Sequence, residues 1–140
     1  MCGRYDNLIA RDAYRGLFKA GRLPKSNFPP RYNAQAAAIS RGIAKRRSLI
    51  PATGFYEWQQ RADGKQPYRF RRKDLEPFAF AGIWEFARIG GEEILSACMI
   101  VGQPNPLVSG VHDRMPVMLL ADDYDRWLDP GARPVNSSRC

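Results

Sequence analysis

Helical spacing of apolar residues is confined to the first part of the chain. Between residues 6 and 22, apolar side chains recur every three or four positions, at Ala10, Ala13, Tyr14, Leu17 and Phe18. Asp6 is a suitable N-cap for this segment, and Gly21 is a suitable stop. The pattern predicts a helix over 6–22. A proline-rich connector follows, and then a weaker helical stretch over 34–47 that ends in a basic cluster.

From residue 48 onward, the pattern changes to short stretches that are typical of strands. The first of them, 48–58, contains Pro51 and Gly54, which favours a bent or bulged strand over a straight central one. Turns are predicted at the DG pair 63–64 and at the GG pair 90–91. Further strands are predicted over 67–73, 76–86, 92–102 and 115–120, with a loop over 105–114 and a short helix over 121–129.

These elements predict an α+β fold, with one compact domain over residues 1–140. Antiparallel strands are expected to dominate it and to form a bent sheet or partial barrel, with short helices near each end. The chain is long enough for one hydrophobic core but not for two. It contains no internal repeat and no low-complexity tract.

The net charge of the chain indicates which class of partner it binds. The chain has 22 Lys+Arg against 14 Asp+Glu, a formal net charge of +8. Arginine binds phosphate oxygens with two N–H groups, and neutralised phosphates release counterions, so the balance favours a polyanion. Solubility alone is the alternative. No apolar run reaches transmembrane length, and the start, MCGRYDNLIARDAYR, has no apolar signal region. We therefore expect a cytoplasmic protein without a membrane partner.

The three cysteines, Cys2, Cys98 and Cys140, are widely spaced and form no CxxC pair. Their odd number and their spacing argue against a disulfide framework and against a zinc site. No other motif indicates a metal or a cofactor, so neither is expected. Cys98 lies in the apolar run ILSACMIVG and is predicted to be a buried core thiol.

Cys2 has a chemical option that an internal cysteine lacks. Its side chain is small enough for normal removal of Met1, after which Cys2 carries a free α-amine beside its thiol. The pKa of an α-amino group is about 7.7–8.0, so part of the amine is neutral at pH 7. Such an aminothiol condenses with an aldehyde to an imine and then closes to a thiazolidine ring. A cysteine that stands second by coincidence is the alternative.

His112, the single histidine, lies in GVHDRMP and is a candidate acid–base group. Asp113 is placed to orient its ring, and Arg114 supplies a cation for an anionic ligand. The alternative is a loop histidine with a structural hydrogen bond.

Glu57 lies in GFYEW, where strand alternation puts Phe55 and Glu57 on one face. A carboxyl that shares a face with aromatic side chains is a candidate proton donor. The alternative is an edge-strand glutamate that faces water, and Glu85 in GIWEF has a similar setting.

Taken together, several stretches resemble one family. MCGRY, PRYN, RRSLIPATGFYEW, FAFAGIWE and VHDRMPVMLL occur in the order seen in the SRAP family (SOS-response-associated peptidase), whose members crosslink to abasic sites in single-stranded DNA. The resemblance extends from residue 1 to about residue 128, and MCGR, LIPATGFYEW and HDRMP are specific in combination.

The resemblance implies roles for four catalytic residues. Cys2 becomes the N-terminus and forms a thiazolidine with the ring-opened sugar aldehyde. Glu57 transfers protons, and His112 assists opening of the sugar and reversal of the crosslink. Asn33 is the best match for the asparagine that holds the N-terminal amine and the sugar.

The resemblance also implies the partner. Arg4 and Arg114 match family positions that contact phosphates, and the other motif residues expected at the nucleic acid are Gly3, Arg31, Met115 and Pro116. A monomer is expected that acts in the DNA damage (SOS) response of a bacterial cell and associates with the nucleoid when it is on DNA.

The chain departs from the family pattern in its middle. Members normally carry an RYN motif, a Trp-rich segment and then a second motif, whereas RYNAQAAA here runs the two motifs together without the Trp-rich segment. Two other functions stay open. One is a thiol peptidase in which His112 activates Cys2, and the other is a non-catalytic nucleic-acid-binding protein that keeps the basic charge.

Overall fold

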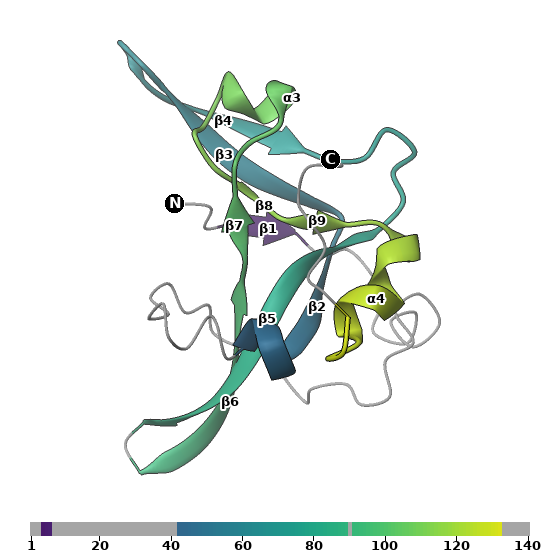
Figure 1. Ribbon diagram of the computed structural model, residues 1–140. Coiled ribbons are helices and arrows are strands. Elements are labelled where there is room, and N and C mark those ends of the chain that lie inside the picture. Colours follow the sequence, from purple (N-terminus) through teal and green to yellow (C-terminus); the bar gives the residue numbers. More distant parts are fainter. Residues whose placement is uncertain (1–3, 7–41, 90, 133–140) are drawn as a thin grey trace.

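The computed structural model describes residues 4–6, 42–89 and 91–132 (Figure 1). The predicted helix over 6–22 and the connector after it lie outside these residues, except for Asp6, which ends a strand. The candidate residues Cys2, Gly3, Arg31 and Asn33 also lie outside them. From the weaker helical stretch, residues 42–45 form a helical turn.

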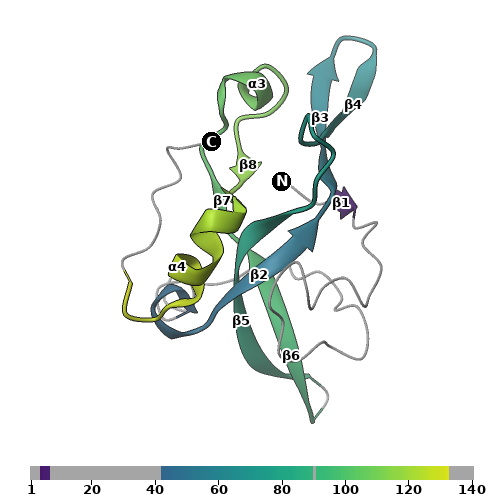
Figure 2. The ribbon, with the colours of Figure 1, turned by 90° about the vertical axis from the view of Figure 1, so that its right-hand side faces the viewer.

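Antiparallel strands make up most of the described structure, as the predicted fold class requires. The strands are β1 (Arg4–Asp6), β2 (Arg47–Ala52), β3 (Gly54–Arg61), β4 (Gly64–Phe70), β5 (Phe78–Ile89), β6 (Glu92–Met99), β7 (Val101–Gly102), β8 (Met115–Pro116) and β9 (Met118–Leu119). One sheet has the order β1-β3-β4, and a second has the order β2-β5-β6 with β9 also paired to β5. Strands β7 and β8 form a separate pair. The β3–β4 and β5–β6 hairpins project toward opposite ends of the molecule (Figures 1 and 2).

The bend predicted within residues 48–58 is a change of sheet. Strand β2 ends at Ala52 and β3 begins at Gly54, so the chain crosses from one sheet to the other at Thr53. Pro51 lies in β2, at the edge of its sheet, where a missing backbone N–H breaks no ladder. The segment is therefore two strands rather than one bulged strand.

Both predicted turns are present. Gly64 and Gly91 have φ angles of 136° and 89°, which only glycine adopts without strain, and they close the β3–β4 and β5–β6 hairpins. Three other predictions need correction. The expected strand over 92–102 is divided at Ile100 into β6, which pairs with β5, and β7, which pairs with β8. The expected loop over 105–114 contains a short helix, α3 (Pro106–Ser109), which the Asn105 side chain caps. The expected strand over 115–120 is divided at Val117 into β8 and β9, which pair with different partners.

Strand β5 supplies both core clusters from alternate positions. Phe78 and Phe80 pack with Phe55, Val108 and Met115, and their rings meet edge to face with centroids 5.2 Å apart. Full burial of a phenylalanine side chain contributes about 1.5–3 kcal/mol. The second cluster, on the opposite face of β5, contains Ala79, Ala81, Leu119, Tyr124 and Trp127.

The predicted C-terminal helix is confirmed as a 3₁₀ turn, η1 (Ala121–Asp123), followed by α4 (Tyr124–Leu128). Its indole donor, Trp127 Nε1, bonds the Ser48 carbonyl at 2.9 Å, and the Arg47 guanidinium donates to the carbonyls of Trp127, Asp129 and Ala132. Arg47 therefore connects this helix to β2.

The thiol of Cys98, which was predicted to be buried, is only half-buried, and burial raises its pKa.

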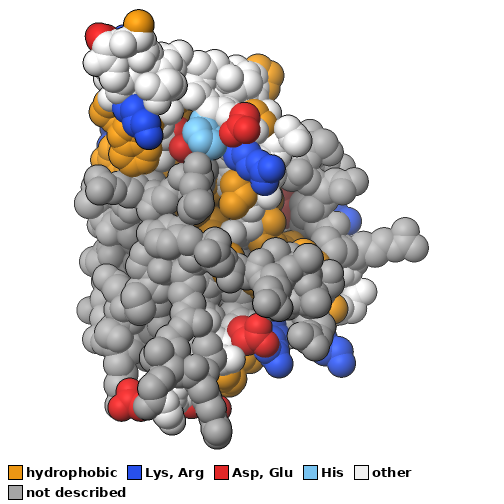
Figure 3. All heavy atoms as spheres, turned by 90° about the vertical axis from the view of Figure 1, so that its left-hand side faces the viewer, with side chains coloured by type: hydrophobic (Ala, Val, Ile, Leu, Met, Phe, Trp, Pro, Cys, Tyr) orange, Lys and Arg blue, Asp and Glu red, His pale blue; other side chains and the backbone are white. Residues whose placement is uncertain are grey.

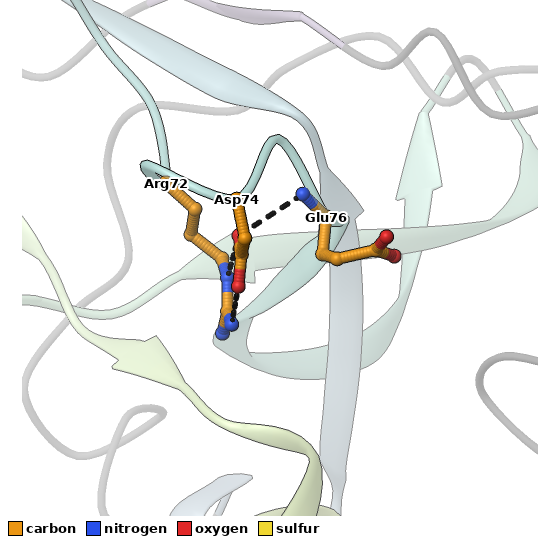
Figure 4. A network of polar contacts seen from close by, with 3 residues as sticks. All are labelled: Arg72, Asp74 and Glu76. Atoms are coloured by element: carbon orange, nitrogen blue, oxygen red, sulfur yellow. Dashed lines mark hydrogen bonds and ion pairs between the residues drawn. The ribbon is translucent and has the colours of Figure 1, made fainter.

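The loop between β4 and β5 is held by an ion pair (Figure 4). Arg72 Nε donates to Asp74 Oδ1 at 2.9 Å, a second guanidinium nitrogen contacts Oδ2, and the backbone N–H of Glu76 donates to Oδ1 at 3.1 Å. The bond from Arg72, with that from the Glu76 N–H, lowers the pKa of Asp74 from 3.8 to about 2.

This lowered pKa predicts a pH-dependent contribution to stability. A carboxyl whose pKa is lower in the folded protein stabilises it above the unfolded value, and this contribution disappears as the pH falls through the folded value. We expect Asp74→Asn to lower the urea unfolding midpoint at pH 7 and to have progressively less effect as the pH falls from 3.8 to about 2. The control is Glu76→Gln, whose side chain points away from the pair (Figure 4). An equal effect of both substitutions at pH 7 would contradict the assignment.

Candidate active site

Glu57 is a buried carboxyl in strand β3. Its residue is 1% exposed, and it lies directly opposite Tyr68 of β4 on the face of the sheet that Phe55 shares. Burial of an ionisable group is costly unless the group is paired or hydrogen-bonded. The edge-strand glutamate facing water, which the sequence left open, does not describe this residue. Glu85 differs, because its carboxylate is half-exposed and pairs with Arg46 at 2.6 Å.

His112 lies close to Glu57 in the fold, although the two residues are far apart in the sequence. Its Nε2 lies 3.9 Å from Glu57 Oε2, and its side chain is 20% exposed. The His112 backbone N–H donates to the Val108 carbonyl at 2.9 Å, and Val108 is buried in the same cluster as Phe55. The core thus brings together two residues that are distant in sequence.

The two nitrogens of the His112 ring have different surroundings. Nδ1 lies 3.1 Å from the backbone nitrogen of Arg114, 3.2 Å from the Arg114 carbonyl oxygen and 3.2 Å from Asp113 Oδ1. The first of these groups donates and the other two accept, so the tautomer of the ring decides which of them Nδ1 bonds. Nε2, on the other side of the ring, faces Glu57 Oε2 at 3.9 Å.

The site opens on one face of the molecule. Figure 3 shows the histidine at the surface, with acidic and basic side chains beside it. Asp113 and Arg114 are both exposed. The face therefore presents an acid–base group next to a cation, the combination that the HDR sequence predicts.

Of the other described candidate residues, one lies in a strand beside Glu57 and two lie in the core. The backbone of Arg4 lies in β1 opposite Tyr56, one position from Glu57 along β3. Met115 is 4% exposed and Pro116 is fully buried, so their side chains pack in the core and do not face solvent. A nucleic-acid contact by either stays a prediction.

The sequence pattern did not single out Gln59. The same alternation that groups Phe55 with Glu57 places Gln59 on that face, and alternation was the signal that could have found it. Its side-chain amide donates to the Gly110 carbonyl at 2.7 Å, in the loop that leads to His112.

Within the described ranges, no group of three histidine, cysteine or acidic residues is arranged to hold a metal ion. No helix of this part of the chain is long and apolar enough to cross a bilayer.

The sequence model of the family described as "SOS response associated peptidase (SRAP)" matches residues 35–139. The chain belongs to this family. The resemblance found in the motifs is thus confirmed. Among curated relatives, the abasic site processing protein YoaM of Bacillus subtilis is 38% identical over 96 residues, which cover 66% of this chain and 42% of the relative. The abasic site processing protein HMCES of Gallus gallus is 35% identical over 157 residues, which cover 96% of this chain and 39% of the relative.

Solved structures with a similar fold are also known. A crystal structure of a protein from Bacteroides thetaiotaomicron matches with a TM-score of 0.63 and 30% identity, and covers 69% of this chain and 44% of that one. A protein from Bordetella bronchiseptica matches with a TM-score of 0.60 and 33% identity, over 67% of this chain and 49% of that one. The chain thus spans less than half the length of each of these four proteins.

The burial of Met115 predicts a large effect of truncation on stability. Met115 packs with the phenylalanines of β5, and its sulfur faces the Asn105 backbone N–H at 3.1 Å. We expect Met115→Ala to lower the free energy of unfolding by about 2–5 kcal/mol, because it leaves a cavity beside the His112 loop. The matched control is Leu107→Ala in α3, where the side chain is 72% exposed and the expected change is small. Similar urea midpoints for the two variants would contradict this packing role.

Proposed function

We propose that this SRAP chain recognises abasic sites in single-stranded DNA and crosslinks to them through Cys2 as part of a DNA damage response. The observation that carries the proposal is the pair formed by buried Glu57 and His112, with Oε2 and Nε2 3.9 Å apart. An ionisable pair of this kind, partly open to solvent, suits proton transfer to and from a bound substrate. The names of the two curated relatives, both abasic site processing proteins, support the substrate class.

The proposal places Cys2 at this pair because Cys2 precedes Arg4 by two residues in the sequence. Arg4, in β1, lies opposite Tyr56, next to Glu57. In the proposed mechanism, the thiol and the α-amine of Cys2 approach the pair from this end of β1.

The proposed reaction joins one aldehyde to one aminothiol and releases one water. The Cys2 amine adds to the aldehyde carbon of the opened sugar, and the resulting carbinolamine loses hydroxide as water to give an imine. The Cys2 sulfur then adds to the imine carbon, and the nitrogen takes up a proton as the thiazolidine closes. Glu57 moves protons between the amine and the departing hydroxyl, while His112 assists opening of the sugar.

The DNA is held mainly by charge. Arg114 is exposed beside His112, and the whole chain carries a net charge of +8. Arginine side chains bind phosphate oxygens without reading the sequence, which suits a lesion that has lost its base. Met115 and Pro116, which are buried directly after Arg114, act by fixing the backbone that presents it.

The first test of this function is the identity of the nucleophile. Single-stranded DNA that carries one abasic site is incubated with the protein, and adducts are counted on a denaturing gel. We expect an adduct with the wild type and with Cys98→Ala, and none with Cys2→Ala, because only Cys2 offers an amine and a thiol together. The mass of the intact protein should show that Met1 has been removed. Binding without any adduct would support the non-catalytic alternative, and retention of Met1 would exclude the mechanism.

A second test concerns the proton carrier. We expect Glu57→Gln to slow crosslinking by about 10²–10⁴-fold, because an amide of the same shape cannot exchange a proton. The control is Glu85→Gln, which removes the other motif glutamate, paired with Arg46 outside the site. Crosslinking rates are compared at saturating DNA. Equal rates for Glu57→Gln and the control would remove Glu57 from this role.

A further inference from the structure

A hydrogen-bonded cluster lies next to the Glu57–His112 pair, on the same face of the β3–β4 hairpin. Gln59 is at its centre. Its Nε2 donates to the Gly110 carbonyl at 2.7 Å, and its Oε1 accepts from Tyr68 Oη at 3.2 Å and from Arg61 Nε at 3.1 Å. Arg61 Nη2 also donates to Tyr68 Oη at 2.6 Å.

The chemistry of these partners fixes the orientation of the Gln59 amide. The Gly110 carbonyl can only accept, so the NH₂ group must face it. The guanidinium of Arg61 can only donate, so the amide oxygen must face Arg61. Both ends of the amide are thus satisfied in one orientation, and rotating it by 180° would break both interactions.

This amide joins the two segments that carry the site. Gln59 follows Glu57 by two positions in β3, and Gly110 precedes His112 by two positions. The bond from Gln59 to Gly110 therefore connects the strand of one member of the pair to the loop of the other, close to both.

Backbone bonds also act within that loop, because the Val111 N–H donates to the Val108 carbonyl at 2.8 Å. Before the loop, Val108 is anchored in the core, and its carbonyl accepts from the His112 N–H. After the loop, Met115 and Pro116 pair with β7. Gly110 itself is exposed and has no side chain that could pack. The Gln59 bond adds a direct side-chain contact from Gly110 to β3.

We propose that Gln59 is a positioning residue that sets the distance between Glu57 and His112, and that Arg61 and Tyr68 hold Gln59 in the orientation this requires. The proposal rests on the proposed function, since the distance matters because the pair transfers protons. At 3.9 Å the two side chains are already at the limit of an ion pair, so a small shift of the loop separates them.

The test compares two neighbouring glutamines. Gln59→Met removes the donor and the acceptor but keeps the length of the side chain. Gln60→Met is the matched control, because Gln60 lies on the opposite face of β3 and is exposed, and because its one side-chain bond among the described residues is to the Arg61 carbonyl, at 3.4 Å. We expect Gln59→Met to lower the crosslinking rate at saturating abasic-site DNA by about tenfold, because misplaced acid–base groups transfer protons poorly. The DNA concentration at half-maximal rate should stay unchanged.

A second readout does not depend on crosslinking. Because the sequence has a single histidine, ¹⁵N NMR of the imidazole reports on His112 alone. We expect the ring signals of Gln59→Met to shift or broaden, and those of Gln60→Met to match the wild type. Gln59→Glu keeps the acceptor for Arg61 but places an oxygen against the Gly110 carbonyl, so it should disturb the ring as Gln59→Met does. It also serves as the second variant if Gln59→Met does not fold.

The outcomes separate the two proposals. If the ring signals and the crosslinking rate of both Gln59 variants match those of Gln60→Met, the positioning role is overturned. It is also overturned if the rate falls only through weaker DNA binding. If the wild type forms no adduct at all, the proposed function fails, and the imidazole signals alone decide whether Gln59 positions His112.

Discussion

Burial of residues 78–83 of strand β5 on both faces is the constraint on which the rest of the structure depends. Its even-numbered residues, Phe78 and Phe80, pack into one cluster, while Ala79 and Ala81 pack into the other. A strand covered on both sides must pair along both edges to satisfy its backbone. Strand β2 pairs with residues 78–83 along one edge of β5. Strands β9 and β6 pair with residues 79–80 and 82–89 along the other edge. Helix α4 covers Ala79 and Ala81 with Tyr124 and Trp127. The chain crosses to the other sheet at Thr53, directly after β2.

The positions of Glu57 and His112 depend on the core cluster around Phe78 and Phe80. Phe55 enters this cluster two positions before Glu57, and Val108 enters it four positions before His112. Each ionisable residue is therefore a short, regular distance along the chain from a fully packed anchor. Interiors are close-packed and resist small displacements, so the core holds the two anchors, Phe55 and Val108, in place. The Gln59 bond to Gly110 acts on the exposed part of the loop that follows Val108.

The sequence predicted the parts of this structure that depend on local chemistry. Gly64 and Gly91 marked the hairpins because left-handed φ angles require glycine, and alternation placed Phe55 and Glu57 on one face. It did not predict the crossover at Thr53, because Pro51 and Gly54 indicate a bend without saying which sheet receives the chain. Helix α3 was missed because it is only four residues long, too short for a periodic pattern. The approach of His112 to Glu57 is a tertiary contact, and only the family resemblance pointed to it.

The contrast between Glu57 and Glu85 shows why burial, and not motif, separates a candidate catalytic carboxyl from a structural one. Both follow an aromatic residue in an apolar strand, in GFYEW and GIWEF. Glu85 is half-exposed and pairs with Arg46, a permanent cation, so the ion pair is screened by water. Glu57 is buried, and its carboxylate lies 3.9 Å from the imidazole of His112. A carboxyl placed for stability alone gains more from a permanent partner, whereas a titratable partner allows the proton to move. The fold places the buried carboxyl, Glu57, one position along β3 from Tyr56, which pairs with Arg4 of β1.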